Sequence, residues 1–136
     1  FRLPQIIGEY DPSPKVVNRF LGAAANEMPI VVTGDGSSSR DFVSVSDVAE
    51  IILRSVGQRI NTAINLVSGN ALTMLGLVDI IKGLSPEVDI SFVSGSSKET
   101  RFQFDSGKFK RYFPGFVFEN RADVLKQIYD YKRERL

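Results

Sequence analysis

The chain contains 136 residues, 43% hydrophobic and 24% charged, with a formal net charge of +1 and neither cysteine nor histidine. The missing thiols and imidazoles exclude a disulfide scaffold, the commonest metal sites and the usual catalytic triads, and the balanced charge does not favour nucleic acid or anionic lipid. No apolar run is long enough to span a membrane, so the composition predicts one soluble domain, which we expect in the cytoplasm.

Residues 1–8 are predicted to form a short extended segment that ends at Gly8. The chain starts without a methionine and, by this prediction, inside a strand. We therefore expect it to be a piece of a longer protein, and an ordinary processed N-terminus is the alternative.

Helical and extended patterns alternate in the next part of the chain. Apolar residues recur at helical spacing over residues 16–24, after a loop that contains two prolines. Residues 30–32 are β-branched and predict a strand. Residues 34–39, rich in glycine and serine, predict a turn, and residues 42–45 resume an extended segment.

A second helix is predicted to begin at an N-cap Ser46 and to end before Gly57. Residues 63–67 are predicted to form a strand, and Thr73 is placed to cap a third helix that runs to Leu84. The buried stripe of the second helix is expected to contain four apolar residues: Val48, Ile51, Ile52 and Val56.

Residues 88–93 alternate well enough to predict another strand. Asp105 is expected to cap a short helix that ends before Pro114, and Asn120 to begin the last helix. Because the strands are short and unevenly spaced, this order of elements favours a mixed α/β lobe over a full parallel sheet.

The segment from Gly34 to Asp41 is the most informative candidate site. Its small residues allow backbone amides to approach an oxyanion, and Arg40 can hold the same anion with its guanidinium fork. The alternative is a simple hairpin turn, because Asp-Gly is a common turn sequence. Lys98 and Arg101 form a second cationic candidate, for which a surface charge paired to a carboxylate is the alternative.

Taken together, the residues do not predict a catalytic centre. The chain has no nucleophile–base pair of the usual kind, and no Gly-x-Gly-x-x-Gly turn after a strand that would hold a dinucleotide. We therefore expect a binding lobe without catalytic, cofactor-binding or metal-binding residues.

The order of the motifs resembles a known family. A Gly-Asp-Gly-Ser-x-Ser-Arg-Asp-Phe-Val-x-Val-x-Asp block over residues 34–47, preceded by Arg2-x-x-Gln5-x-x-Gly8, resembles the C-terminal half of extended short-chain dehydrogenases/reductases. These form the NAD-dependent epimerase/dehydratase family, which acts on nucleotide sugars. Three further segments are similar to the family's later motifs: Asn65-Leu66-x-x-Gly69, Asp105-Ser106-Gly107-Lys108 and the closing Tyr-x-Tyr helix.

The resemblance implies a fold and an enzymatic parent. The fold is a small C-terminal substrate lobe without the Rossmann domain, which in the family binds NAD or NADP and carries a catalytic Tyr-x-x-x-Lys pair. Residues 1–8 would be the tail of the missing Rossmann region, and residues 9–136 the substrate-binding lobe. The chain alone is then expected to be inactive and to bind no cofactor. Its implied partners are a nucleotide sugar and the missing domain, and a homodimeric parent is compatible with them.

The resemblance also implies substrate contacts. Arg40 matches the arginine that grips the diphosphate, and Gln5 takes a position that is often asparagine near the diphosphate and sugar. The family's Arg-Pro-Gly-Asp loop has lost its arginine here, which Lys98 or Arg101 replaces. Two open alternatives are a reductase of a non-nucleotide carbonyl substrate and a non-catalytic binding protein of this fold. The remaining implied contacts lie at the start of the first helix: Val17 and Asn18.

A missing Rossmann domain predicts an apolar patch that this domain would otherwise cover. The patch is expected to include four residues of the first segment: Phe1, Leu3, Ile6 and Ile7.

Overall fold

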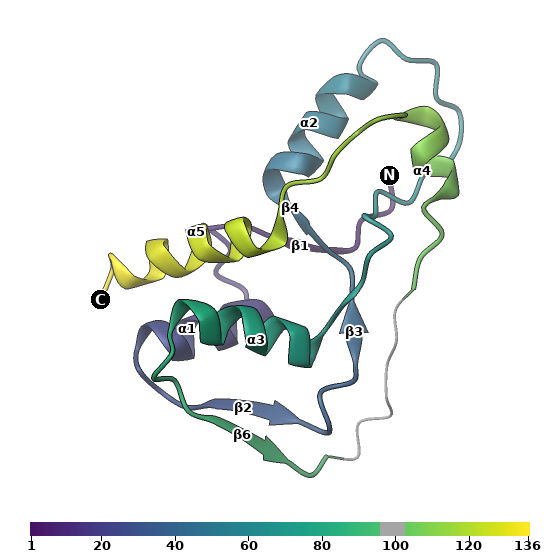
Figure 1. Cartoon of the computed structure of the whole chain (residues 1–136). Coiled ribbons are helices and arrows are strands. Elements are labelled where there is room, and N and C mark those ends of the chain that lie inside the picture. Colours follow the sequence, from purple (N-terminus) through teal and green to yellow (C-terminus); the bar gives the residue numbers. More distant parts are fainter. Residues whose placement is uncertain (96–102) are drawn as a thin grey trace.

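The computed structural model describes residues 1–95 and 103–136 (Figure 1). As expected, it is a mixed α/β structure with short strands. Its elements in chain order are β1 (Gln5–Ile7), α1 (Val16–Ala25), β2 (Ile30–Thr33), β3 (Ser39–Arg40), β4 (Phe42–Ser44), α2 (Val45–Ser55), β5 (Leu72–Thr73), α3 (Met74–Leu84), β6 (Ile90–Val93), α4 (Gly107–Tyr112) and α5 (Arg121–Arg133).

The described strands pair into three two-stranded sheets. β1 lies parallel to β4, with Gln5 opposite Phe42. β2 lies parallel to β6, and β3 is antiparallel to β5, with Arg40 opposite Leu72. These pairings bring together segments that are far apart in the sequence.

The strand predicted over residues 63–67 does not form. Only one residue of this segment, Asn65, forms a bridge, with Arg2. The amide of Arg2 donates to the carbonyl of Ile64 at 2.8 Å, and the amide of Leu66 donates to the carbonyl of Arg2 at 2.9 Å. Pairing stops there because Pro4 has no amide hydrogen and the next residues of the chain pair with β4 instead.

The start of α2 differs from the prediction by two residues. Ser44 is the N-cap, and its hydroxyl accepts the amide hydrogen of Asp47 at 2.9 Å. Ser46 lies inside the first turn, so the prediction that it caps the helix was wrong. Both serines fit the capping preference, but only the hydroxyl of Ser44 is placed to reach an unpaired amide of the first turn.

The predicted caps of α3 and α5 are confirmed. The hydroxyl of Thr73 accepts the amide of Gly76 at 3.0 Å, and the side chain of Asn120 accepts the amide of Ala122 at 2.9 Å. Asp105 accepts the amide of Gly107 at 2.7 Å but lies one residue before the N-cap of α4.

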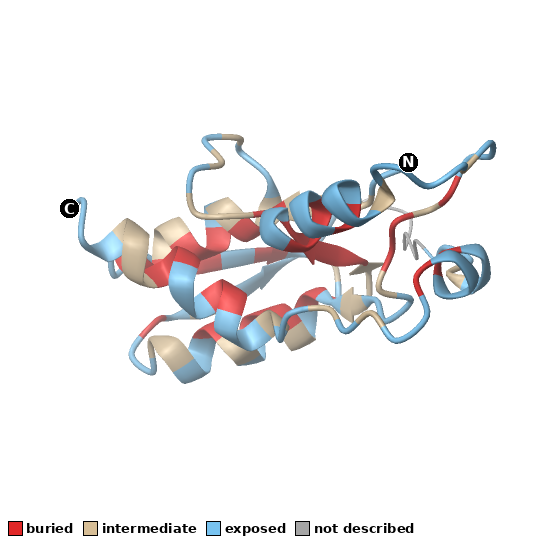
Figure 2. Cartoon of the chain, turned by 90° about the horizontal axis from the view of Figure 1, so that it is seen from above, coloured by how far each residue is buried: buried red, intermediate tan, exposed pale blue. Residues whose placement is uncertain are grey.

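Buried side chains form two clusters. The larger one lies among α1, α3, α5 and the β2–β6 pair, and Figure 2 shows the buried faces of the helices turned inward. The predicted apolar faces of α3 and α5 are confirmed, because their core-facing residues are buried. The smaller cluster joins α2 to the segment around residue 64 and to α4: Val43, Val48, Ile51, Ile64, Leu66, Phe109 and Phe113.

The predicted stripe of α2 is only half correct. Val48 and Ile51 are buried, but Ile52 and Val56 are 47% and 75% exposed. α2 is covered on one side only, so the buried apolar residues of this helix are those that pack in the smaller cluster.

The predicted N-terminal patch is also smaller than expected. Phe1 and Leu3 are exposed and Ile6 is half-buried, but Ile7 is only 4% exposed and belongs to the larger core. The prediction was wrong for Ile7 because neighbouring residues of a strand face opposite sides. In the described part of the chain, no helix is long and apolar enough to cross a membrane.

Candidate functional site

Gln5 and Arg40, the two residues expected at the diphosphate, lie at the same pocket. The β1–β4 pairing brings them together, and the amide of Gln5 donates to the carbonyl of Asp41 at 3.2 Å. The pocket has a volume of about 160 Å³. Its lining residues are Leu3, Pro4, Gln5, Arg40, Asp41 and Phe104.

The side chain of Asp41 is turned into the protein. Asp41 is only 3% exposed. One carboxylate oxygen accepts the hydroxyl of Ser68 at 2.6 Å, and the other accepts the amide of Gly69 at 2.8 Å. Among the described residues that line the pocket, Arg40 alone carries a positive charge. The neighbouring Asp41 carboxylate accepts hydrogen bonds from Ser68 and Gly69.

The turn before Arg40 is used to cap α3. The carbonyls of Gly36 and Ser38 accept the amides of Leu75 and Met74 at 3.1 and 2.9 Å. Gly36 has φ +76°, and a Cβ atom there would lie 2.8 Å from the Leu75 side chain. The segment is a turn but not a hairpin, because the strands on either side of it, β2 and β3, pair with β6 and β5 and not with each other.

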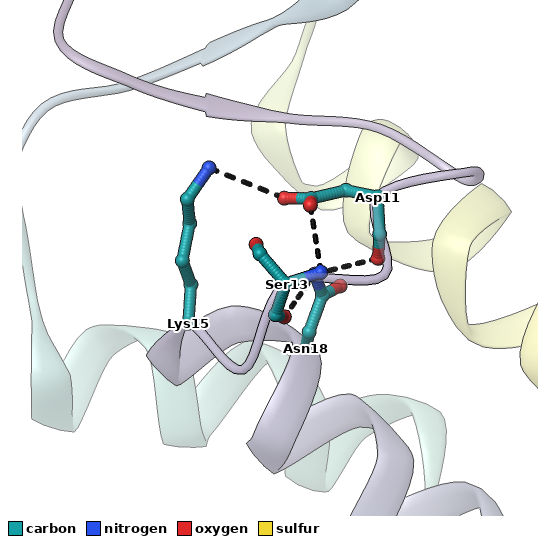
Figure 3. A network of polar contacts seen from close by, with 4 residues as sticks. All are labelled: Asp11, Ser13, Lys15 and Asn18. Carbon is teal, nitrogen blue, oxygen red and sulfur yellow. Dashed lines mark hydrogen bonds and ion pairs between the residues drawn. The ribbon is translucent and has the colours of Figure 1, made fainter.

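Val17 and Asn18 lie at the start of α1 and do not line the Arg40 pocket. Val17 is 1% exposed and packs in the larger core. The side-chain amide of Asn18 donates to the carbonyls of Asp11 and Ser13 at 2.9 and 3.0 Å (Figure 3). In this structure both side chains therefore hold α1 and its preceding loop in place.

The loop before α1 is organised around the carboxylate of Asp11. This carboxylate accepts the amide of Ser13 at 2.9 Å and pairs with Lys15 at 3.3 Å (Figure 3). Hydrogen bonds from Ser13, together with Lys15, lower the pKa of Asp11. The predicted contacts Lys98 and Arg101 lie outside the described residues.

A second cavity of about 450 Å³ lies between β4, the loop after residue 67 and the start of α5. Asp47 lines it and is only 4% exposed, and both of its carboxylate oxygens lie 3.3 Å from the amide of Glu119. Burial away from water raises the pKa of Asp47. In the residues that the structure describes, no group of three or more acidic side chains could hold a metal ion.

The contribution of Ser68, Gly69 and Phe104 to this region was not predicted from the sequence. Asp41 belonged to the recognised block, but its hydrogen bonds could not be foreseen. The partners of Asp41 follow it by 27 and 28 residues, and no local periodicity predicts such a contact. The signal in the sequence was Gly69 itself, which ends the Asn65-Leu66-x-x-Gly69 motif and has φ +74° in the structure.

Known proteins share this fold and its motifs. A model of the NAD dependent epimerase/dehydratase family matches residues 1–67, which include Gln5, Arg40 and Asp41. The chain belongs to this family. It is 30% identical over 97 residues to UDP-glucuronic acid decarboxylase 2 of Arabidopsis thaliana, a match that covers 67% of this chain and 22% of the plant protein.

Solved structures of other epimerase/dehydratase family enzymes have the same fold. The chain matches an NAD-dependent NDP-hexosamine 5,6-dehydratase involved in tunicamycin biosynthesis with a TM-score of 0.88 and 18% identity, over 98% of this chain and 45% of the other. It also matches UDP-glucuronic acid 4-epimerase of Bacillus cereus, in complex with UDP-glucuronic acid and NAD, with a TM-score of 0.84 and 18% identity. This match covers 99% of this chain and 45% of the epimerase. The chain thus spans less than half the length of these enzymes.

Proposed function

We propose that this chain is the substrate-binding lobe of a longer NAD(P)-dependent epimerase, dehydratase or reductase of nucleotide sugars, here called the parent enzyme. Arg40 binds the diphosphate of the substrate. Residues 1–8 are the tail of the Rossmann region of the parent enzyme, and residues 9–136 are the lobe. The observation that carries the proposal is the meeting of Gln5 and Arg40 at one pocket.

The chemistry of the pocket supports a ligand that combines an anion with hydroxyl groups. A guanidinium fork donates two parallel hydrogen bonds to phosphate oxygens. The side-chain amide of Gln5 can both donate and accept hydrogen bonds, which suits a sugar hydroxyl or a phosphate oxygen. Leu3, Pro4 and Phe104 add apolar walls.

The described residues do not fit NAD(P). Pyrophosphate groups of dinucleotides bind at the N-terminus of a helix that follows a strand and a glycine-rich turn. Here α2 follows β4 directly, and its first turn is capped by Ser44. The first amides of α3 are taken by Gly36, Ser38 and Thr73. We therefore place the cofactor and the catalytic residues in the rest of the parent enzyme.

The lobe contributes binding energy and orientation. A bound nicotinamide cofactor would supply the hydride chemistry of the parent enzyme. Contacts of Arg40 and Gln5 to the diphosphate are remote from the reacting carbon, and they fix the position of the sugar relative to the rest of the enzyme.

The test titrates UDP and NAD separately into the ¹⁵N-labelled 136-residue chain and follows the amide chemical shifts by NMR. We expect UDP to bind with a Kd on the order of 1 mM, about −4 kcal/mol, and to shift the resonances of Gln5 and Arg40. NAD is expected to bind more weakly than UDP.

A lack of any response to UDP would overturn the proposal in favour of a phosphate-free carbonyl substrate or a non-catalytic role. Sub-millimolar binding of NAD would overturn the assignment of the cofactor to the rest of the parent enzyme.

A further inference from the structure

A hydrogen-bonded clasp lies beside the Arg40 pocket. It consists of the Asp41 carboxylate, the Ser68 hydroxyl at 2.6 Å and the Gly69 amide at 2.8 Å. Because Asp41 is only 3% exposed, its carboxylate is shielded from water and depends on these two donors for its hydrogen bonds. The clasp therefore fixes the loop at residues 68–69 against the β3–β4 junction.

The clasp is connected to each wall of the pocket. The carbonyl of Asp41 accepts the amide of Gln5 at 3.2 Å, which ties β1 to the junction next to Arg40. On the other side, a Cβ atom at Gly69 would lie 2.7 Å from the hydroxyl oxygen of Ser106. Gly69 thus brings the clasp into close contact with the segment that includes Phe104, another lining residue.

The charge of Asp41 cannot itself favour an anionic ligand. A carboxylate beside Arg40 lowers the positive potential at the pocket and repels a diphosphate. Any favourable effect of Asp41 on diphosphate binding must therefore come from the geometry that its hydrogen bonds impose.

We infer that Asp41 is a positioning residue of the diphosphate pocket. Through its hydrogen bonds with Ser68 and Gly69, it keeps Gln5, Arg40 and the segment of Phe104 in place around the pocket. This inference rests on the proposed function. It predicts that nucleotide binding depends on the hydrogen bonds of Asp41 and is not favoured by its negative charge.

The experiment compares Asp41→Ala, Asp41→Asn and a matched control, Asp47→Ala, in the 136-residue chain. Asp47 is also a buried aspartate with a backbone amide donor, but it does not line the Arg40 pocket. UDP affinity is measured by NMR at a temperature at which thermal unfolding shows all variants to be folded. The resonance of the Arg40 guanidinium Nε–H group is recorded without ligand as a second readout.

Asp41→Ala is expected to weaken UDP binding by about 10-fold or more, on the scale of one lost charge-assisted contact. Asp41→Asn is expected to stay within about 3-fold of the wild type, because its amide can accept from Gly69 and donate to Ser68. Asp47→Ala is expected to lose stability but to bind UDP within about 3-fold of the wild type. The Arg40 resonance should move only in Asp41→Ala.

Wild-type affinity in Asp41→Ala would overturn the inference, and so would an equal loss of affinity in Asp47→Ala. If Asp41→Ala does not fold, Ser68→Ala removes one of the two bonds and is expected to weaken UDP binding in the same direction. Unchanged UDP affinity in Ser68→Ala would then overturn the inference.

If Arg40→Met leaves UDP binding unchanged, the proposed function itself fails. A loss in Arg40→Met with none in the Asp41 variants refutes the positioning role alone.

Discussion

Replacing Arg40 with methionine removes the guanidinium and keeps an unbranched apolar side chain of similar reach. Arg40 is half-buried, and its backbone pairs with Leu72 in the short β3–β5 ladder, which the substitution leaves intact. A hydrogen bond to a charged group contributes about 1.5–3 kcal/mol, so Arg40→Met should weaken UDP binding roughly 10- to 150-fold. Arg40→Lys should recover only part of the affinity, because lysine keeps the charge without the planar fork.

The assay is an NMR titration of the 136-residue chain with UDP, together with the thermal midpoint of each variant. Arg59→Met is the matched control, since Arg59 is an exposed arginine that does not line the pocket. It removes the same charge from the chain, so a non-specific electrostatic effect would weaken binding equally in both variants. We expect nearly unchanged affinity in the control and a similar midpoint in all three variants. Unchanged affinity in Arg40→Met with a large drop in its midpoint would refute the reasoning and make Arg40 a structural residue.

Three further predictions concern stability. Ser44→Ala should lower the free energy of unfolding by about 0.5–2 kcal/mol, whereas Ser46→Ala should change it by less than about 0.5 kcal/mol, as measured by urea unfolding; the reverse order would restore Ser46 as the cap. Gly36→Ala should destabilise the chain by about 1–2 kcal/mol because of its positive φ, while Gly22→Ala in the open middle of α1 should stabilise it by about 0.5–1 kcal/mol, and equal thermal midpoints would contradict this. The raised pKa of Asp47 means that its contribution to stability is fully present below the ordinary value of 3.8 and is lost as pH rises through the folded-state pKa. The difference in unfolding free energy between wild type and Asp47→Asn should therefore change over this acidic range, and a constant difference between pH 3 and 7 would disprove the effect.

Local patterns in the sequence were sufficient for most of the helices. The spacing of apolar residues predicted the buried faces of α3 and α5, and Thr73 and Asn120 were correctly placed as caps. These features depend on interactions within a few residues, such as a side-chain oxygen and an amide in the first turn. The same short-range chemistry singled out Arg40, because small residues and one arginine at a turn suggest an anion site.

Only the tertiary structure decided which of these segments meet. The resemblance assigned both Gln5 and Arg40 to the substrate diphosphate, and the parallel pairing of β1 with β4 is what brings them to one pocket. The same pairing buried Ile7 and ended the contact of the first segment with residues 64–66 after one bridge. The bonds of Asp41 to the loop at Ser68 were likewise invisible in the sequence. Strand pairing and buried hydrogen bonds join residues at large sequence separation, so their partners are selected by the packing of the whole chain rather than by neighbouring residues.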